Sequence, residues 1–122
     1  MEKQEISRDT IAAAYNRIRP HVRKTPVIDC AGADFGIDAG QLTFKLEHLQ
    51  HAGSFKTRGA FANLMLRDVP RAGVAAASGG NHGLAVARTA FAARTKAPIF
   101  LPSNVSPAKV ATMQRWGATT QT

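Results

Sequence analysis

The sequence predicts an α/β fold, a parallel sheet with helices on both faces. Short apolar segments alternate with helical segments of about 10 to 15 residues, and glycines stand where predicted strands meet helices. Of the 122 residues, 44% are hydrophobic, which suffices for a packed core. A chain of this length suits one ordinary domain, and no apolar run approaches the ~20 residues of a membrane span.

The first predicted helix covers residues 7–20, with Ser7 as a plausible N-cap. Its apolar residues recur at helical spacing and form one face: Ile11, Tyr15 and Ile18. Pro20 and Pro26 then take the chain out of the helix. Residues 27–40 are mixed in character and contain glycine, which predicts a strand fragment followed by a loop.

From residue 42 onward, predicted strands and helices alternate. The predicted strands are 42–47, 74–77, 98–101 and a segment that starts at 118. The predicted helices are 55–67, 81–95 and 107–116. Ser54 can cap the first of these helices, and Pro107 fits the first turn of the last. Because strands separated by helices of this length pair in parallel, we expect one parallel sheet.

The charge and the metal-binding residue types exclude several function classes. The net charge is +8, and residues 69–122 carry six basic side chains and no acidic one. These six are scattered, so we expect no nucleic-acid partner. The histidines lack metal-site spacing with cysteine or carboxylates, and we expect no metal. The single cysteine, Cys30, cannot form an internal disulfide, which fits a cytoplasmic protein without a membrane segment.

The segment Ser78-Gly79-Gly80-Asn81-His82-Gly83 joins a predicted strand to a predicted helix. Glycines there let the backbone approach a ligand and direct N–H groups at an anion, with help from the helix N-terminus. The residues alone leave phosphate, carboxylate or a simple tight turn open. A dinucleotide fingerprint is excluded, because the first glycine is missing and no acidic residue follows Asp68.

Lys56 is a second candidate, at the first turn of the predicted helix 55–67. The positive end of the helix dipole disfavours a charged lysine there, and a neutral amine is what imine chemistry with a carbonyl requires. Taken alone, Lys56 is also typical of a solvated surface lysine. Arg58 adds positive charge nearby and is likewise interpreted as a surface residue.

Together, GSFKTRGA (residues 53–60) and SGGNHG (78–83) resemble the fold-type II, tryptophan synthase β-like, pyridoxal-phosphate (PLP) enzymes. The resemblance is strongest to the threonine/serine dehydratase (ammonia-lyase) and serine racemase group, which typically reads GSFK-x-RGA and then S-[SA]-GNH. RIRPHVRKTPV, KLEHLQ and PSNVSPAKVATMQRWGA also match, so the resemblance covers essentially the whole chain. It implies that residues 1–122 are the N-terminal portion of a two-domain enzyme whose C-terminal part is absent here.

The resemblance also implies roles for individual residues. Lys56 matches the catalytic lysine that binds PLP covalently and moves protons. Phe55 matches the aromatic residue beside the cofactor ring, and Asn81 the asparagine that hydrogen-bonds the cofactor's 3′-oxygen. Ser54 matches a helix cap and substrate contact. The residues that match the loop around the substrate carboxylate are Ser78, Gly79, Gly80, Asn81 and His82.

The implied reaction converts L-threonine or L-serine to a 2-oxo acid and ammonia. Gly79 stands where racemases of the group carry a serine that acts as a second base, so we expect elimination to be favoured over racemisation. A serine racemase-type enzyme and a non-catalytic remnant that acts as a binding module stay open. The family's glycine-rich phosphate loop cannot be located in this sequence. We therefore expect residues 1–122 alone to bind PLP weakly, and the full-length protein to form a homo-oligomer.

Overall fold

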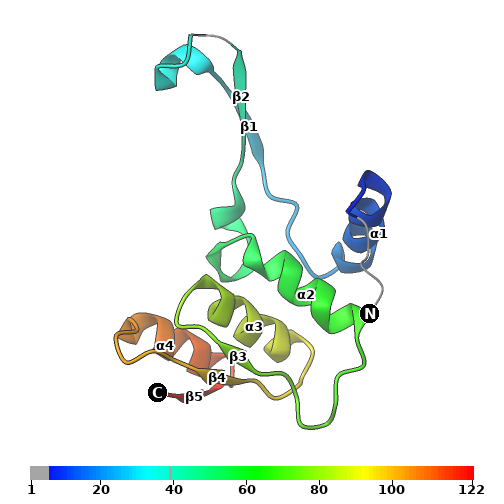
Figure 1. The fold of residues 1–122 in the computed structure, drawn as a ribbon, viewed down its shortest axis with the longest axis vertical. Coiled ribbons are helices and arrows are strands. Elements are labelled where there is room, and N and C mark those ends of the chain that lie inside the picture. The colour runs from blue at the N-terminus through cyan, green and yellow to red at the C-terminus, as the bar shows by residue number, and fades with distance from the viewer. Residues whose placement is uncertain (1–5, 39) are drawn as a thin grey trace.

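The computed structural model describes residues 6–38 and 40–122, which form an α/β body and a projecting β-hairpin (Figure 1). In chain order the helices and strands are α1 (Arg8–Ile18), β1 (Val27–Ala31), β2 (Gln41–Lys45), α2 (Lys56–Leu66), β3 (Ala76–Ala77), α3 (Asn81–Ala92), β4 (Pro98–Phe100), α4 (Pro107–Arg115) and β5 (Thr119–Gln121). Short 3-10 turns lie at η1 (Gly32–Phe35), η2 (Glu47–Leu49) and η3 (His51–Gly53). Each predicted helix is present, although α3 ends three residues before its predicted end.

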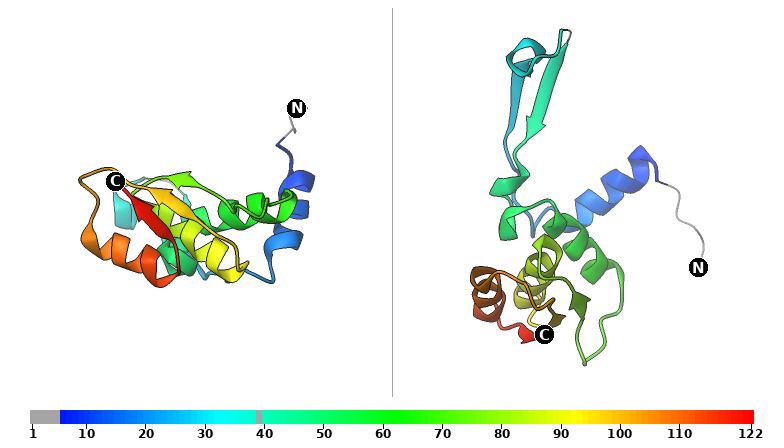
Figure 2. Two further views of the ribbon diagram at one scale, coloured as in Figure 1. Left: turned by 90° about the horizontal axis from the view of Figure 1, so that it is seen from below. Right: turned by 60° about the vertical axis from the view of Figure 1, so that its left-hand side comes forward.

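The body is built on a three-stranded parallel sheet in the order β3-β4-β5, with Ala76 opposite Ile99 and Pro98 opposite Thr119. This confirms the predicted parallel α/β sheet. The helices that follow β3 and β4, α3 and α4, lie on the same face of the sheet (Figure 2, left), so within residues 6–38 and 40–122 the expected helices on both faces are not seen. Because alternate residues of a strand point to opposite faces, Ile99 is fully buried under these helices while Phe100 is 48% exposed.

Small side chains let the helices lie close to the sheet. Alanines occupy the buried face of α3, and Ile99 and Met113 are the largest fully buried residues of this core. The buried cluster consists of Ala76, Ala87, Ala90, Ala97, Ile99, Leu101, Met113 and Ala118. Burying apolar area between α3, α4 and the sheet is the main stabilising contribution here.

The strand predicted at 42–47 does not join the parallel sheet. It is β2, which ends at Lys45 and pairs antiparallel with β1, with Val27 opposite Lys45 and Ala31 opposite Gln41. The connection between β1 and β2 is too short for the crossover that parallel strands need, so the two strands form an antiparallel hairpin. The hairpin extends away from the body (Figure 1) and exposes apolar side chains, among them Val27 and Phe44.

α1 begins as predicted, at a capping box formed by Ser7 and Thr10. Thr10 N donates to Ser7 Oγ at 3.2 Å, and Ser7 N donates to Thr10 Oγ1 at 2.9 Å. The predicted apolar face of α1 packs only at its last turn, where Ile18 is buried. Ile11 and Tyr15 are 60% and 40% exposed, and they line an open cavity described below.

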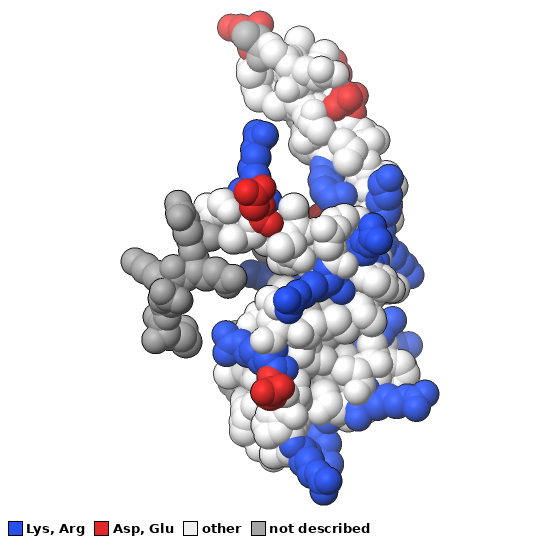
Figure 3. All heavy atoms as spheres, turned by 90° about the vertical axis from the view of Figure 1, so that its right-hand side faces the viewer, with Lys and Arg blue, Asp and Glu red and all other residues white. Residues whose placement is uncertain are grey.

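Basic side chains are spread over the face shown in Figure 3, from the base of the hairpin to the opposite end of the body, with few acidic side chains among them. Arg94 and Lys96 follow the C-terminal end of α3, where the negative end of the helix dipole favours cations. Within the residues described, no helix is long and apolar enough to cross a membrane.

Candidate functional site

Lys56 lies in the first turn of α2, as the sequence predicts, and is the first residue of that helix. Its Nζ lies 4.8 Å from the ring centroid of Phe55, and both side chains are exposed. Ser54 occupies the capping position that the sequence predicts. Its backbone is extended, Phe55 after it already has helical backbone angles, and the hydroxyl of Ser54 accepts a hydrogen bond from Lys56 N at 3.4 Å.

The loop before α2 is held by buried polar side chains. Thr57, which is fully buried, donates its hydroxyl to the carbonyl oxygen of His51. Gln50 is 2% exposed, and its side-chain amide makes two hydrogen bonds to the backbone of Arg23. Gln50 Oε1 accepts from Arg23 N, and Gln50 Nε2 donates to the carbonyl oxygen of Arg23, each at 2.9 Å. Ala52 has a φ of 60°, a left-handed conformation that is strained for alanine and persists because these contacts hold the loop.

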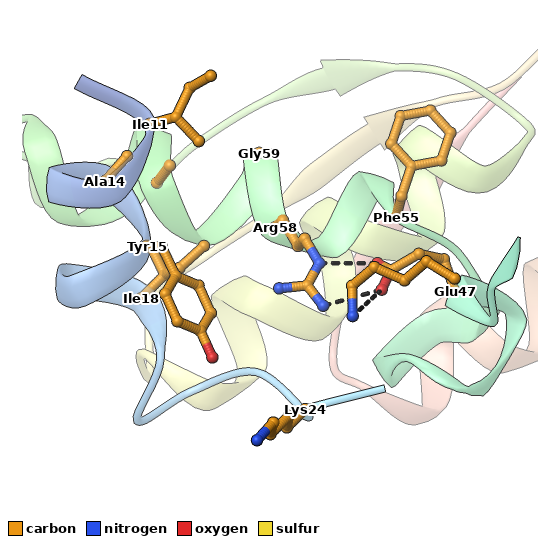
Figure 4. A pocket seen from close by; sticks show the side chains of 11 residues that line it. Ile11, Ala14, Tyr15, Ile18, Lys24, Glu47, Phe55, Arg58 and Gly59 are labelled. Carbon is orange, nitrogen blue, oxygen red and sulfur yellow. Dashed lines mark hydrogen bonds and ion pairs between the residues drawn. The ribbon is translucent and has the colours of Figure 1, made fainter. Parts of the chain in front are cut away.

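Glu47 and Arg58 form a two-pronged ion pair at the base of this loop (Figure 4). Arg58 Nε donates to Oε2 and Nη2 donates to Oε1, each at 2.8 Å, and the hydroxyl of Thr25 also donates to Oε1. The Arg58 hydrogen bonds, opposed by burial and aided by Thr25, lower the pKa of Glu47 from 4.5 to about 2. The same hydrogen bond raises the pKa of Arg58. The interpretation of Arg58 as a surface residue is therefore wrong, since its side chain is 22% exposed and paired.

The glycine loop joins β3 to α3. Ser78 N donates to the carbonyl oxygen of Phe100 at 3.0 Å, and Gly80 N donates to Ser78 Oγ at 3.2 Å. Gly80 is the N-cap of α3, which has no side-chain cap bond and no acidic residue in its first turn. Asn81 and His82, the first two helical residues, are exposed. This uncapped helix N-terminus directs backbone N–H groups outward and suits an anion.

Two glycines of this loop have no room for a side chain. A Cβ at position 79 would lie 2.8 Å from Val105 Cγ2 and 2.9 Å from Pro102 Cδ. A Cβ at position 83 would overlap the carbonyl oxygen of Ser78 and lie 2.9 Å from Met113 Cε. The loop thus lies tightly between α3 and the segment that leads from β4 to α4.

The structure brings the two motif segments to one end of a helix pair. α2 and α3 pack side by side and start at the same end (Figure 1), and α3 also packs against η3. A cavity of about 620 Å³ lies between α1 and α2 and is lined by Phe55, Arg58 and Glu47 together with the apolar face of α1 (Figure 4). Ser78 and Gly79 line a second cavity of about 420 Å³ beside β4.

Sequence reasoning missed the polar residues that support this arrangement: Thr25, Glu47, Gln50 and Thr57. KLEHLQ was recognised only as a matching segment, and no local pattern reveals which buried polar groups pair across the chain. His51 lies in the same loop, and burial, then the positive charges of Arg88 and Arg23, lower its pKa. The described residues contain no group of three or more His, Cys, Asp or Glu side chains that could hold a metal ion.

Comparison with known proteins places these features in a family. The family model described as "Pyridoxal-phosphate dependent enzyme" matches residues 18–121. A phenylserine dehydratase from Ralstonia pickettii is 40% identical over 111 residues, which cover 88% of this chain and 33% of that protein. A catabolic L-threonine dehydratase from Staphylococcus aureus is 36% identical over 115 residues, covering 93% of this chain and 33% of the relative.

Solved structures agree with the sequence matches. The structure of maize serine racemase superposes with a TM-score of 0.82 at 35% identity, over 93% of this chain and 35% of that one. The chain thus spans about a third of the length of the proteins that it matches. Dehydratases and a racemase match at similar identity, so the matches do not separate these two reactions.

Proposed function

The chain belongs to the family of pyridoxal-phosphate dependent enzymes, and from this premise we propose that it carries the lysine of an ammonia-lyase that converts L-threonine or L-serine to a 2-oxo acid and ammonia. Family membership confirms the resemblance seen in the motifs, the fold-type II architecture and PLP as the cofactor. The reaction and the roles of individual residues are the proposal.

The packing around Gly79 is the observation that carries the choice of elimination. Racemisation with two bases needs a proton-exchanging side chain on the face opposite the lysine, and the family's racemases carry it at this position. In this chain the space for a Cβ at position 79 is taken by Val105 and Pro102. Because residue 79 is a glycine, it has no side chain that could act as a base, and the packing leaves little room for one. We propose that proton transfer takes place on one side of the substrate only.

The residues present fit PLP. Lys56 offers an exposed amine at the start of α2, and the ring of Phe55 lies 4.8 Å from it. We propose that Lys56 holds the cofactor covalently and moves the α-proton, and that Asn81 hydrogen-bonds the cofactor ring. When bound, PLP supplies an electron sink for the charge that develops at the α-carbon.

We propose that the first turn of α3 binds the substrate carboxylate, because its N–H groups are uncapped and the loop before it is glycine-rich. Ser78, Gly79 and Gly80 shape this site, and Asn81 and His82 add side chains at its rim. Ser54, which is buried beside Lys56, positions the lysine backbone and is the proposed additional substrate contact.

Covalent capture of the cofactor tests this proposal directly. The protein as its gene encodes it is mixed with PLP, reduced with borohydride and digested, and mass spectrometry then locates the modified lysine. We expect the label on Lys56 and formation of a 2-oxo acid from L-threonine or L-serine. Lys109→Ala is the matched control, because Lys109 is an exposed lysine in the first turn of a different helix, α4.

Two other outcomes would overturn the proposal in different ways. Conversion of L-serine to D-serine faster than to pyruvate would identify a racemase. Absence of both PLP capture and turnover would identify a non-catalytic binding module. We further propose that the protein is cytoplasmic and forms a homo-oligomer, and light scattering of the purified protein tests the oligomeric state. We also propose that it has no nucleic-acid partner, so we expect no salt-sensitive binding to DNA or RNA.

A further inference from the structure

Arg58 lies two residues after Lys56 on the first turn of α2 and binds Glu47, which lies at the other end of the loop that leads into this helix. The ion pair therefore closes the loop of residues 48–55 together with Lys56 and Thr57, the first two residues of α2. Lys56 and Phe55 sit at the carboxyl end of that loop, next to the point of closure. The backbone that carries Lys56 thus depends on how firmly the pair holds.

The geometry of the pair is restrictive. Both carboxylate oxygens of Glu47 accept from Arg58 at 2.8 Å, and a two-pronged contact fixes the orientation of both side chains as well as their separation. The side chains are 17% and 22% exposed, so water competes less with the pair than it does at an open surface. Arg58 Nη2 also reaches the carbonyl oxygen of Arg23 and the hydroxyl of Thr25 at 3.4 Å.

The pair also joins the loop to the segment between α1 and β1. Thr25 donates to Glu47, and Lys45 Nζ donates to the carbonyl oxygen of Thr25 at 3.1 Å. The segment around residues 23–25, the end of β2 and the start of α2 are therefore tied at one point, beside the cavity in Figure 4. The fully buried hydroxyl of Thr57 supplies a second tie, to His51.

From this arrangement we propose that Glu47 and Arg58 are positioning residues, whose ion pair holds residues 54–58 so that the amine of Lys56 is presented in a fixed place. This inference rests on the proposed function for the role of Lys56. The left-handed conformation of Ala52 supports it, because a strained loop relaxes when its closing contacts are removed. Neither residue needs to touch substrate or cofactor for this role.

The test compares Glu47→Gln and Arg58→Lys with Asp29→Asn in the protein as its gene encodes it. Asp29 is a matched control because its carboxylate also accepts a threonine hydroxyl, from Thr43 at 2.6 Å, but lies on the exposed hairpin. Amide hydrogen exchange is measured over residues 54–58, together with the rate at which Lys56 captures PLP. We expect both pair variants to exchange about tenfold faster in this segment and to capture PLP about tenfold more slowly.

The double variant separates positioning from general destabilisation. If the residues act through their pair, the double variant Glu47→Gln with Arg58→Lys slows capture no more than either single change. In the substrate assay kcat falls while KM changes little, and exchange in α4 stays at the wild-type rate. Exchange that rises equally in α2, α3 and α4, or losses that add in the double variant, would overturn the inference.

The outcomes also separate this inference from the proposed function. Wild-type protein that fails to capture PLP on Lys56 contradicts the proposed function, and hydrogen exchange at 54–58 still decides whether the pair orders the loop. If wild-type protein captures PLP on Lys56, and Glu47→Gln has the same hydrogen exchange at 54–58 and the same capture rate as wild type, the positioning role is contradicted. The proposed function is then left intact.

Discussion

The α-carbon of Gly83 faces the carbonyl oxygen of Ser78 so closely that a β-carbon at position 83 would overlap that oxygen. Gly83 lies in the first turn of α3 and is buried, and the added β-carbon would also lie 2.9 Å from Met113 Cε. A glycine at this position is what allows the loop of Ser78, Gly79 and Gly80 to fold back on the start of α3. The shape of the proposed carboxylate site therefore depends on a packing contact.

Gly83→Ala is expected to destabilise the protein, because the methyl group must displace a backbone carbonyl or a core methionine. We expect a loss of about 2–4 kcal/mol in the free energy of unfolding, measured by urea titration. Gly59→Ala is the matched control in α2, where nothing lies within 4 Å of an added Cβ. There alanine should stabilise the helix by up to about 1 kcal/mol. Equal effects of the two changes would contradict this account of Gly83.

The ionised form of Glu47 should contribute to stability above pH 4.5. Its pKa is about 2 in the folded protein and 4.5 in the absence of the pair, so the contribution is complete at neutral pH and is lost as the pH falls from 4.5 toward 2. Between pH 7 and pH 3 we expect Glu47→Gln to lose about 1 kcal/mol less stability than wild type, after allowance for solvent screening. Urea unfolding at the two pH values measures this difference, and parallel pH curves for wild type and variant would argue against it.

The order of elements beyond residue 55 could be predicted because local signals agree with the global fold: short apolar strands, helices of regular period, and glycines between them. The placement of β2 could not, because residues 42–47 have the same strand pattern whether their neighbour is parallel or antiparallel. The pairing of Arg58 depends on a partner eleven positions earlier and on two 3-10 turns between them. Lys56 was located correctly because a helix start is a local signal, whereas the apolar face of α1 predicted more burial than Ile11 and Tyr15 have.

Removing the amine of Lys56 should abolish PLP capture without unfolding the protein. Lys56 is exposed, and its only described aromatic contact is with the adjacent Phe55, so Lys56→Ala removes little packing. We expect no borohydride-trapped label and a change in unfolding free energy within about 0.5 kcal/mol. Label on a different lysine of the Lys56→Ala protein, at the wild-type rate, would show that the proposed cofactor lysine is misassigned.

A serine at position 79 should fit only when its neighbours are made smaller. In Gly79→Ser the new Cβ meets Val105 Cγ2 at 2.8 Å and Pro102 Cδ at 2.9 Å, so we expect a loss of about 1–3 kcal/mol in stability. Val105→Ala removes the first obstacle, and the double variant should recover at least half of that loss, a coupling that a double-mutant cycle measures. The same cycle applies to the reaction: the ratio of D-serine to pyruvate formed from L-serine should rise in the double variant above its value in wild type and in either single variant. Stability losses that simply add, with an unchanged product ratio, would mean that Val105 does not restrict position 79, and the argument for one-sided proton transfer would then lose its structural basis.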